Sequence, residues 1–398
     1  MKRVLVSGVG VLSAAGRDAG RFWDSLLAAS PRYAEASAVP GGRIVAAEIR
    51  EADIFDGLGV KIAALDRSAL LAIAAAREAL ADAALSTPFE RPERVAVVIG
   101  TGGGGMASIE EQYLKLNLDR NARPHPATVA KAMVSSSASW VSMATGARGP
   151  CFVTSSACAS AAHAIGMALL LLRSGAADVA IAGGTEAPLT YGCLKAWEAM
   201  KIMSPGPCRP FALGRDGLVL GEGAGALLLE TEEHAARRGV AAAIELAGFG
   251  ANADAGNIVA PDVEGMAGAM RLALADGGLA ARDVAYVNAH GTGTAANDAA
   301  ETEALKAVFG ASSCPPVSSI KGVAGHTLGA AGGVEAVATV LAMRRGVAPP
   351  TANFDAPDPR CDIDCVPNVP RPMAIQAALS NSFAFGGLNA TLAFRALG

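Results

Sequence analysis

Short runs of apolar, β-branched residues alternate along the chain with longer segments rich in Ala and Leu. A short continuous apolar run is typical of a buried strand, and a longer segment with apolar residues three and four apart is typical of a helix. We expect strands at residues 3–7, 95–100, 178–182, 223–230, 241–249 and 284–288, and helices at residues 68–84, 159–173, 264–276 and 299–309. This alternation predicts an α/β fold with largely buried strands.

The pattern restarts after a basic, helix-like stretch at residues 234–238. A second series of strands and helices then follows, with the same alternation as the first. We therefore predict two α/β halves, the first spanning residues 1–240 and the second residues 241–398.

The two halves also show a weak internal similarity. Residues 151–180 and 315–346 share the order of a strand, a polar loop and an Ala/Gly-rich helix. A true repeat and a merely shared composition both account for this likeness. If the repeat is real, Cys158 and His326 lie at equivalent strand-to-helix junctions, where two helix N-termini point at a common cleft.

The composition favours a large folded core and argues against several classes of protein. Of the 398 residues, 52% are hydrophobic and 18% are charged, which suits an enzyme with one or two closely packed domains. The formal net charge of −4, without blocks of like charge, gives no sign of nucleic-acid binding. The apolar stretch at residues 164–172 is far shorter than the roughly 20 residues that span a bilayer, and we expect no export signal and no membrane association. The seven cysteines lack disulfide or zinc-site spacings, so we expect reduced thiols in the cytoplasm.

Two glycine-rich segments resemble parts of nucleotide-binding motifs. They lie at residues 8–10 and 100–105, each directly after a predicted strand. The first lacks the third glycine of a dinucleotide-binding motif, and neither is followed by the lysine of a P-loop. We interpret both as places where the backbone turns tightly or approaches another element closely.

A candidate nucleophile stands in the segment SSACASAAHAIG, where strand-like residues 151–154 give way to a helix of small residues. Cys158 lies at the start of that helix. Unpaired N–H groups and the helix dipole favour a thiolate there, so we expect a lowered thiol pKa. The other six cysteines lack such a setting and are expected to pack as small apolar side chains.

Two of the five histidines stand in Gly- and Thr-rich loops. His290 follows the predicted strand at residues 284–288 in VNAHGTGTAANDAAE, and His326 follows Lys321 in SSIKGVAGHTLGAAGG. Catalytic side chains commonly project from loops of this kind. His163, on the same predicted helix as Cys158, is expected to have a structural role.

Together, the segments around Cys158, His290 and His326 resemble the Cys, His and His motifs of elongating β-ketoacyl-acyl carrier protein synthases, members of the thiolase superfamily. The resemblance covers essentially the whole chain, including VLVSGVGVLSAAG at the start, RPFALGRDGLVLGEGAGALLLE in the middle and SNSFAFGGLNATLAF near the end. It implies a thiolase-like fold in which two similar α/β halves form a layered α-β-α-β-α architecture.

The resemblance also implies the catalytic roles. The nucleophile that takes the acyl chain from a carrier-protein thioester matches Cys158, and two histidines serve decarboxylation and condensation. A lysine orders these histidines, and a gating phenylalanine contributes its backbone N–H, with that of Cys158, to an oxyanion hole. The residues that match these catalytic positions are Cys158, His290, His326, Lys321 and Phe385.

Further positions match supporting and binding residues of the family. Asp298 and Glu301 match acidic residues that support the histidine loop. The substrate-binding candidates are Thr292, Thr294, Ile109 and Trp197, and the candidates for a basic rim are Lys61, Arg67 and Lys201. A basic rim would attract an acidic carrier protein through complementary charge.

The implied reaction is a decarboxylative Claisen condensation of an acyl thioester on Cys158 with malonyl-acyl carrier protein. It gives a β-ketoacyl-carrier product and CO2, in fatty-acid synthesis or in type II polyketide or aryl polyene synthesis. No metal or organic cofactor is expected, since the substrates arrive on the phosphopantetheine arm of the carrier. The resemblance implies a homodimer, and a heterodimer with an inactive paralogue is the alternative.

Two other functions within the superfamily also need to be considered. A degradative thiolase would use a second reactive cysteine late in the chain, but Cys361 and Cys365 stand in PDPRCDIDCVP, outside any Gly-rich motif. A chain-length factor, the non-catalytic partner of a ketosynthase, typically lacks the nucleophile that this chain retains. We therefore favour the condensing enzyme over both alternatives.

Four residues depart from the family pattern, namely Ala159, Ala161, Ala384 and Leu388. The first two replace a hydroxyl residue and a glycine beside the nucleophile. Ala384 replaces a glycine of the gate loop and is expected to stiffen it, because alanine restricts positive φ. These changes leave the acyl preference open and slightly favour a specialised pathway.

Overall fold

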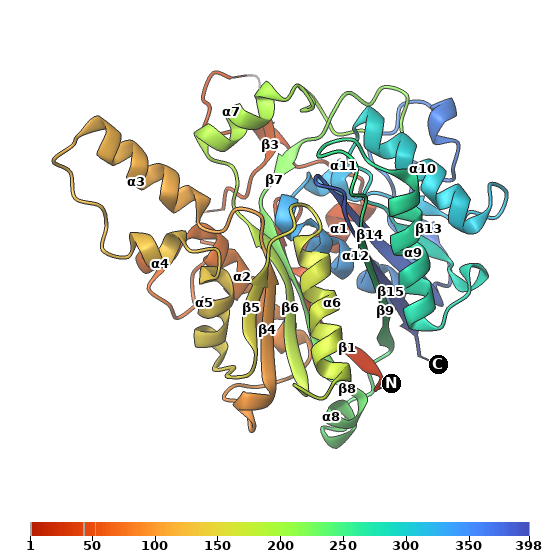
Figure 1. Cartoon of the computed structure of the whole chain (residues 1–398), viewed down its shortest axis with the longest axis horizontal. Helices are drawn as coiled ribbons and strands as arrows, with labels where there is room; N and C mark the ends of the chain where they lie inside the picture. The colour runs from red at the N-terminus through yellow and green to blue at the C-terminus, as the bar shows by residue number, and fades with distance from the viewer. Residues whose placement is uncertain (1, 43, 52, 398) are drawn as a thin grey trace.

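A sheet of ten strands runs through the molecule in the order β11-β10-β14-β15-β9-β1-β8-β6-β4-β5. The computed structural model describes residues 2–42, 44–51 and 53–397 (Figure 1). The strands of this sheet are β1 (Val4–Ser13), β4 (Val95–Gly100), β5 (Cys151–Thr154), β6 (Val179–Glu186), β8 (Gly223–Thr231), β9 (Ile244–Ala253), β10 (Tyr286–Asn288), β11 (Val317–Ser318), β14 (Ala377–Ala384) and β15 (Leu388–Ala396). Smaller sheets join β2 (Ala34–Glu35), β3 (Val45–Ala47) and β7 (Leu220–Gly221), and join β12 (Val347–Ala348) to β13 (Arg371–Pro372).

The ten strands form two sets of five with one winding pattern. On one side of the sheet lie β1, β8, β6, β4 and β5, and on the other lie β9, β15, β14, β10 and β11. If the strands of each set are numbered one to five along the chain, their order in the sheet, from the middle outward, is one, five, four, two, three. The sets meet where Leu5 of β1 pairs with Glu245 of β9. This shared winding confirms that the weak similarity is an internal repeat, whereas a domain division at residue 240 stays a prediction.

Helices cover both outer faces and fill the space between the two sets of strands. The helices α2 (Arg67–Asp82) and α5 (Ser136–Thr145) pack on the first set, and α9 (Val263–Gly277), beside α10 (Ala295–Phe309), packs on the second. Between them, α6 (Ser160–Arg173) and α12 (Ala331–Arg345) contact strands of both sets. The predicted layered α-β-α-β-α architecture is thus confirmed.

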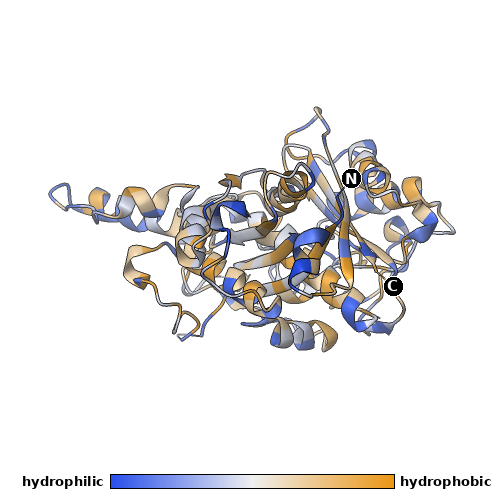
Figure 2. Ribbon diagram, turned by 90° about the horizontal axis from the view of Figure 1, so that it is seen from below, coloured by the Kyte–Doolittle hydropathy of each residue, from blue (hydrophilic) through white to orange (hydrophobic). Residues whose placement is uncertain are grey.

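The remaining helices are short and lie mostly at the periphery. They are α1 (Ala19–Leu27), α3 (Met106–Leu118), α4 (Thr128–Ala132), α7 (Tyr191–Ala199), α8 (Glu232–Arg237) and α11 (Lys321–Ala324), with 3₁₀ turns η1 (Ile62–Ala64), η2 (Pro92–Arg94), η3 (Ala281–Asp283), η4 (Leu328–Ala330) and η5 (Pro359–Cys361). The pair α3 and α4 forms an arm that projects from the body of the molecule (Figure 2). In the part of the chain that the structure describes, no helix has both the length and the apolar character needed to cross a membrane.

Small residues allow the inner helix α12 to be buried on all sides over most of its length. Every residue of α12 from Ala331 to Ala342 is buried. A Cβ atom at Gly333 would lie 2.6 Å from the carbonyl oxygen of Gly225, and one at Gly332 would lie 2.8 Å from the backbone nitrogen of Ala162. Glycine therefore sets how closely α12 approaches both β8 and α6.

Strand β1 extends to Ser13, beyond the predicted end at residue 7, and contains the first glycine-rich segment. Gly8 and Gly10 face α2, where added Cβ atoms would lie 2.1 Å from the oxygen of Ala79 and 2.0 Å from that of Ala75. These glycines are therefore packing positions, as the sequence indicated, and the strand continues through them because antiparallel pairing to β8 satisfies its backbone.

Substitution of Gly10 by Ala should destabilise the protein, because the new methyl group would force α2 away from β1. Overpacking of this kind typically costs about 1–3 kcal/mol. Chemical denaturation would measure the free energy of unfolding. As a control, Gly206→Ala, where nothing lies within 4 Å of an added Cβ, should change it by less than about 0.5 kcal/mol. Equal stabilities of the two variants would contradict the packing role of Gly10.

Candidate active site

A cavity of about 560 Å³ connects the surface with Cys158, His290 and His326. Its walls are mainly apolar. The large apolar side chains that line it are Trp197, Met200, Ile202, Leu218, Ile258, Val259, Met266, Phe383 and Phe385. The three predicted catalytic side chains, from distant parts of the sequence, thus meet at one end of a single apolar cavity.

Cys158 is held in a tight turn between β5 and α6. Ser160 accepts a hydrogen bond from the backbone N–H of Ser156 at 2.8 Å and donates one to the carbonyl of Ala157 at 2.7 Å. Ala157 has a φ of 47°, a conformation that is uncommon for a residue with a side chain. The turn points the Cys158 thiol, whose residue is 6% exposed, toward the two histidines.

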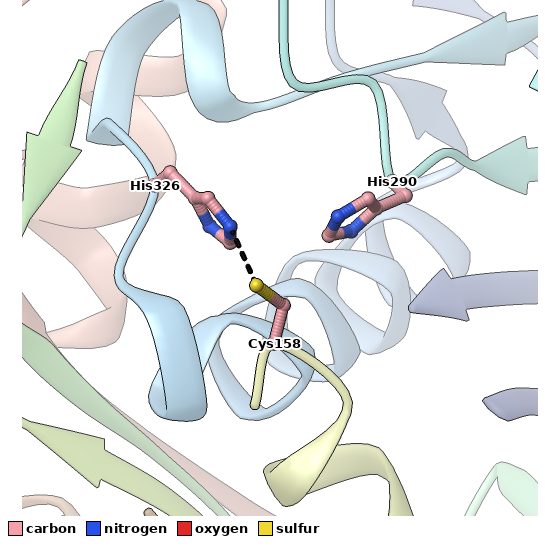
Figure 3. Close-up of side chains that lie close together, drawn as sticks. All are labelled: Cys158, His290 and His326. Atoms are coloured by element: carbon pink, nitrogen blue, oxygen red, sulfur yellow. Dashed lines mark hydrogen bonds between the residues drawn. The ribbon is translucent and has the colours of Figure 1, made fainter. Parts of the chain in front are cut away.

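His326 belongs to the second half of the chain but is fixed by the first half. Its backbone N–H donates to the carbonyl of Val219 at 2.7 Å, and its own carbonyl accepts from Gly221 at 2.9 Å. The His326 Nε2 atom lies 3.1 Å from Cys158 Sγ (Figure 3). Within the described residues, the buried Nδ1 atom of His326 has no hydrogen-bond partner. In the neutral imidazole whose proton is on Nδ1, the Nε2 atom is the acceptor that faces the thiol.

His290 completes the group from the end of β10. Its ring lies 5.4 Å from the His326 ring at an angle of 84° and 6.3 Å from the ring of Phe383. Both histidines face the thiol from above in Figure 3. The sulfur atom and one nitrogen atom of each imidazole all lie within 4.8 Å of one another, so both histidines border the space in front of the thiol.

Lys321 is 1% exposed and binds the histidine loop directly. Its Nζ atom donates to the carbonyl oxygen of His290 and lies 3.4 Å from His290 Nδ1. The ammonium group also forms a buried ion pair with Glu335 of α12. Glu335 was missed in the sequence, although a lone carboxylate in a fully apolar helix segment was the available signal.

Asp298 and Glu301 hold the histidine loop from behind and do not line the cavity. Glu301 accepts hydrogen bonds from the backbone N–H groups of His290 and Gly291, both at 2.8 Å. Asp298 accepts from Phe211 at 2.8 Å and from a second glycine of the loop at 3.2 Å. Both carboxylates are completely buried, so each satisfies backbone donors that water cannot reach.

Burial controls the protonation of the site. It raises the pKa of Cys158 to about 12, although the positive charge of Lys321 lowers it. Burial also holds the pKa of His290 and of His326 well below the ordinary value, and the charge of Lys321 adds to this effect. The expectation of a lowered thiol pKa is therefore wrong for the resting site, because desolvation outweighs the helix N-terminus. At neutral pH the thiol and both imidazoles are uncharged.

The gate candidate Phe385 lies in the turn between β14 and β15. Its ring stacks on that of Trp197, with 5.9 Å between centroids and 17° between planes. The turn closes through Gly386 and Gly387, whose φ angles are 86° and 66°. Both aromatic rings line the cavity, so their contact forms part of the wall that a substrate passes.

The other binding candidates are divided between the cavity and the surface. Thr292, Thr294 and Lys201 line the cavity, and the two threonine hydroxyls lie 2.9 Å apart. Ile109 lies on the α3 arm, and Lys61 is exposed before η1; neither lines the cavity. Arg67 also lies outside it.

Arg67 has a structural contact that the sequence did not indicate. Its guanidinium forms a bidentate ion pair with buried Glu222, at 2.6 Å and 2.7 Å. It also donates to the carbonyl of Ile49 at 2.9 Å. These bonds engage the side chain that was expected to face a carrier protein, so its place in a basic rim stays a prediction.

The thiol and the two imidazoles could also hold a metal ion. Their ligand atoms all lie within 4.8 Å of one another, and zinc binds such groups. The same three groups suffice for acyl transfer, with the thiol as nucleophile and the imidazoles as proton acceptors and hydrogen-bond donors. The expectation of a metal-free site stays a prediction.

Comparison with known families identifies the class of enzyme. The family model of the β-ketoacyl synthase N-terminal domain matches residues 1–235, and that of the β-ketoacyl synthase C-terminal domain matches residues 243–355. The chain belongs to the β-ketoacyl synthase family. This β-ketoacyl synthase is therefore an acyl-transferring condensing enzyme, and its thiolase-like fold is confirmed.

Individual relatives cover the chain from end to end. It is 47% identical over 400 residues to nodulation protein E of Rhizobium sp. (strain N33), covering 99% of both chains. It is 39% identical over 406 residues to 3-oxoacyl-[acyl-carrier-protein] synthase 2 of Staphylococcus aureus (strain COL), covering 99% of this chain and 98% of the relative.

Solved structures agree with the sequence relatives. The ishigamide ketosynthase/chain length factor has a TM-score of 0.94 at 30% identity. A type II PKS ketosynthase, bound to a hexaketide and in complex with its acyl-carrier protein, has a TM-score of 0.90 at 30% identity. In both comparisons, 100% of each chain is covered.

Replacing Lys321 by Met should raise the pKa of the Cys158 thiol further and also raise the pKa of both imidazoles, since the ammonium charge lowers all three. Alkylation of Cys158 by iodoacetamide at alkaline pH should slow about tenfold for each unit of thiol pKa increase. Peptide mass spectrometry would follow the alkylation, and NMR of labelled histidine the imidazoles.

The double variant Lys321→Met/Glu335→Gln is the matched control, because it also removes the unpaired carboxylate that Lys321→Met leaves buried. Since the charge of Glu335 raises the pKa of the thiol, the double variant should recover part of the alkylation rate. An unchanged rate together with unchanged histidine titrations in the single variant would exclude the electrostatic role of Lys321.

Proposed function

We propose that this β-ketoacyl synthase accepts an acyl chain on Cys158 from an acyl carrier protein and condenses it with malonyl-acyl carrier protein. The products are a β-ketoacyl-carrier, two carbons longer, and CO2. The observation that carries the proposal is the 3.1 Å contact of Cys158 Sγ with His326 Nε2 at the end of an apolar cavity. A second imidazole, on His290, faces the same space.

In the first half-reaction, Cys158 Sγ attacks the thioester carbonyl of the acyl-carrier. His326 Nε2 accepts the thiol proton as the S–C bond forms, so the neutral resting thiol need not ionise beforehand. The C–S bond to the phosphopantetheine arm then breaks, and the departing thiolate takes up this proton. Backbone N–H groups of Cys158 and Phe385 are the proposed donors to the tetrahedral oxyanion.

In the second half-reaction, a malonyl thioester occupies the same passage. Loss of CO2 leaves an electron pair on the α-carbon, and the two neutral imidazoles stabilise the resulting enolate through hydrogen bonds to its oxygen. The enolate carbon attacks the acyl carbonyl, and the thiolate of Cys158 leaves. A proton taken up from solvent restores the Cys158 thiol, so one full reaction cycle consumes one proton. The phosphopantetheine thioesters are substrates, so these steps use no cofactor of the enzyme.

A dimer is part of the proposal. Strand β5 ends the sheet order, with β4 as its sheet neighbour, so its outer edge is available to a second β5. The neighbouring α3–α4 arm exposes Tyr113, Leu118 and Val129 by 63%, 80% and 73%. Covering this apolar arm favours association. Ile109 lies on the same arm and would face the partner, which explains its distance from the cavity of its own chain.

The relatives support a proposal for the pathway. Identity to nodulation protein E exceeds identity to 3-oxoacyl-[acyl-carrier-protein] synthase 2, at 47% against 39%. We therefore place this enzyme in a specialised cytoplasmic acyl pathway, with general fatty-acid elongation as the alternative. Because the chain retains its own Cys–His contact, we propose it as a catalytic subunit. We propose a homodimer, with pairing to an inactive paralogue as the alternative.

Cys158→Ala should abolish covalent acylation. Wild-type enzyme mixed with acyl-carriers of varied length and unsaturation should show an acyl adduct in its intact mass, and the preferred carrier identifies the substrate. Cys151→Ala, which removes an exposed thiol instead, should retain the adduct. An adduct of equal amount in Cys158→Ala would refute the proposed nucleophile. Absence of any adduct in the wild type would favour a chain-length-factor role.

His290→Ala and His326→Ala should each retain some acyl adduct but lose condensation. Loss of one donor to a developing oxyanion typically lowers kcat about 10²–10³-fold. Release of CO2 from malonyl-acyl carrier protein and formation of the β-ketoacyl product would be measured separately. His125→Ala, at an exposed position, serves as control and should keep full activity. Full condensation in both catalytic variants would rule out these histidine roles.

A further inference from the structure

A further buried carboxylate lies behind the active site, at the end of β6. Glu186 is 2% exposed and does not line the cavity. No step of the proposed reaction uses it. A carboxylate at such a position requires several hydrogen bonds to offset its desolvation, and these bonds indicate its role.

Each oxygen atom of the Glu186 carboxylate accepts two hydrogen bonds. Oε1 accepts from the hydroxyl of Thr101 at 3.0 Å and from the backbone N–H of Gly103 at 2.9 Å. Oε2 accepts from the N–H groups of Gly102 at 2.6 Å and of Gly329 at 3.0 Å. Since all four partners donate, the ionised carboxylate is the form that fits.

These donors come from the two halves of the chain. Residues 101–103 follow β4 in the first half, whereas Gly329 lies in η4, the turn that follows His326 in the second half. Glu186 therefore joins the His326 turn to the half of the molecule that carries Cys158.

The contact between Glu186 and the Gly329 turn leaves no room for a side chain at Gly329 or at Gly184. A Cβ atom at Gly329 would lie 2.3 Å from Glu186 Oε2 and 2.3 Å from the nitrogen of Gly102. A Cβ atom at Gly184, on the same strand as Glu186, would lie 2.8 Å from the Gly329 carbonyl and 2.5 Å from the methyl group of Ala161 on α6. The His326 turn is thus fixed against the first turn of the nucleophile helix.

We infer that Glu186 is a positioning residue of the condensing site: its carboxylate fixes the Gly329 turn and thereby the distance between His326 Nε2 and Cys158 Sγ. The inference rests on the proposed acyl transfer at Cys158 and assigns the group that aligns it. A second effect follows from its charge. Burial is the main cause that raises the pKa of Cys158, and the carboxylates of Glu335 and Glu186 raise it further.

Glu186→Gln tests both effects. The amide offers one acceptor oxygen, and its NH2 group faces N–H donors, so two of the four bonds are lost. We expect kcat for condensation to fall about 10²-fold, as for a misplacement of about 1 Å, with KM for the acyl-carrier little changed. Loss of the negative charge should move the pH midpoint of Cys158 alkylation by iodoacetamide to lower pH. The thiol would thus become more reactive while the enzyme becomes slower.

Glu230→Gln is the matched control. Glu230 is also completely buried and pairs with Val179, at the opposite end of β6 from Glu186. It binds His234 and Arg238 instead of the active-site loops. This variant should lower the melting temperature without changing the alkylation midpoint or KM, and kcat should stay within about twofold of the wild type.

Gly329→Ala separates position from charge. The added methyl group forces the Gly329 turn away from Glu186 but leaves the carboxylate in place. We therefore expect kcat to fall, whereas the pH midpoint of Cys158 alkylation should not move to lower pH. It also tests the inference if Glu186→Gln does not fold. A folded Glu186→Gln with wild-type kcat, or a wild-type kcat in Gly329→Ala, would overturn the positioning role. Failure of the proposed function can be distinguished from failure of this inference, because the wild type itself would then form no acyl adduct. The alkylation measurement needs no acyl substrate and would still report the effect of Glu186 on the thiol.

Discussion

The structure depends on backbone contacts between the two halves of the chain, because the catalytic thiol and its proton acceptor come from different halves. Cys158 and His326 are 3.1 Å apart. The turns that carry them must therefore lie as close together as backbone segments joined by hydrogen bonds. Side chains at Gly329, Gly332 or Gly333 would separate them. Glycine at these three places is therefore a condition of the chemistry, since no larger residue leaves room for the backbone of the other half.

This close packing also removes water, and desolvation then controls the charges in the site. A thiol and two imidazoles, all neutral at rest, avoid the cost of an isolated buried ion. The buried ammonium group of Lys321 is balanced by Glu335. Burial, together with the positive charge of Lys321, keeps the imidazoles unprotonated by lowering their pKa values. A neutral imidazole can accept a proton at one ring nitrogen atom and donate a hydrogen bond from the other. The close packing that brings the catalytic groups together thus also sets their protonation states, because it excludes water.

Much of this arrangement could be predicted from the chain alone. The apolar runs located most strands, and the loops around Cys158, His290 and His326 identified the residues that meet in the cavity. The thiol pKa was predicted in the wrong direction, because helix position is visible in a sequence whereas the depth of burial is not. Glu335 and Glu186 were missed for a similar reason: each is a single carboxylate whose donors come from distant segments.

The repeat explains features that the sequence presented separately. The glycine-rich loop after β4 occupies the place in the first half that the His290 loop after β10 occupies in the second. Likewise Glu186 ends β6 where Ala384 ends β14. In the first half of the chain, these strand ends bind the second half through the Glu186 carboxylate and backbone N–H groups. In the second half, the equivalent strand ends carry His290 and the loop of Phe385.

The gate itself shows how two departures from the family pattern become a single change. Ala384 and Leu388 pair across the base of the β14–β15 hairpin, so these two departures from the expected pattern form one apolar contact. Ala384 is 9% exposed and belongs to the main core, against which Leu388 packs. Burial of this pair extends the rigid strands up to the turn and leaves residues 385–387 as the part able to move. Movement of Phe385 then has to occur within this turn, against its stacking on Trp197. We therefore predict that the aromatic contact, rather than bending of the strands, controls entry of an acyl chain.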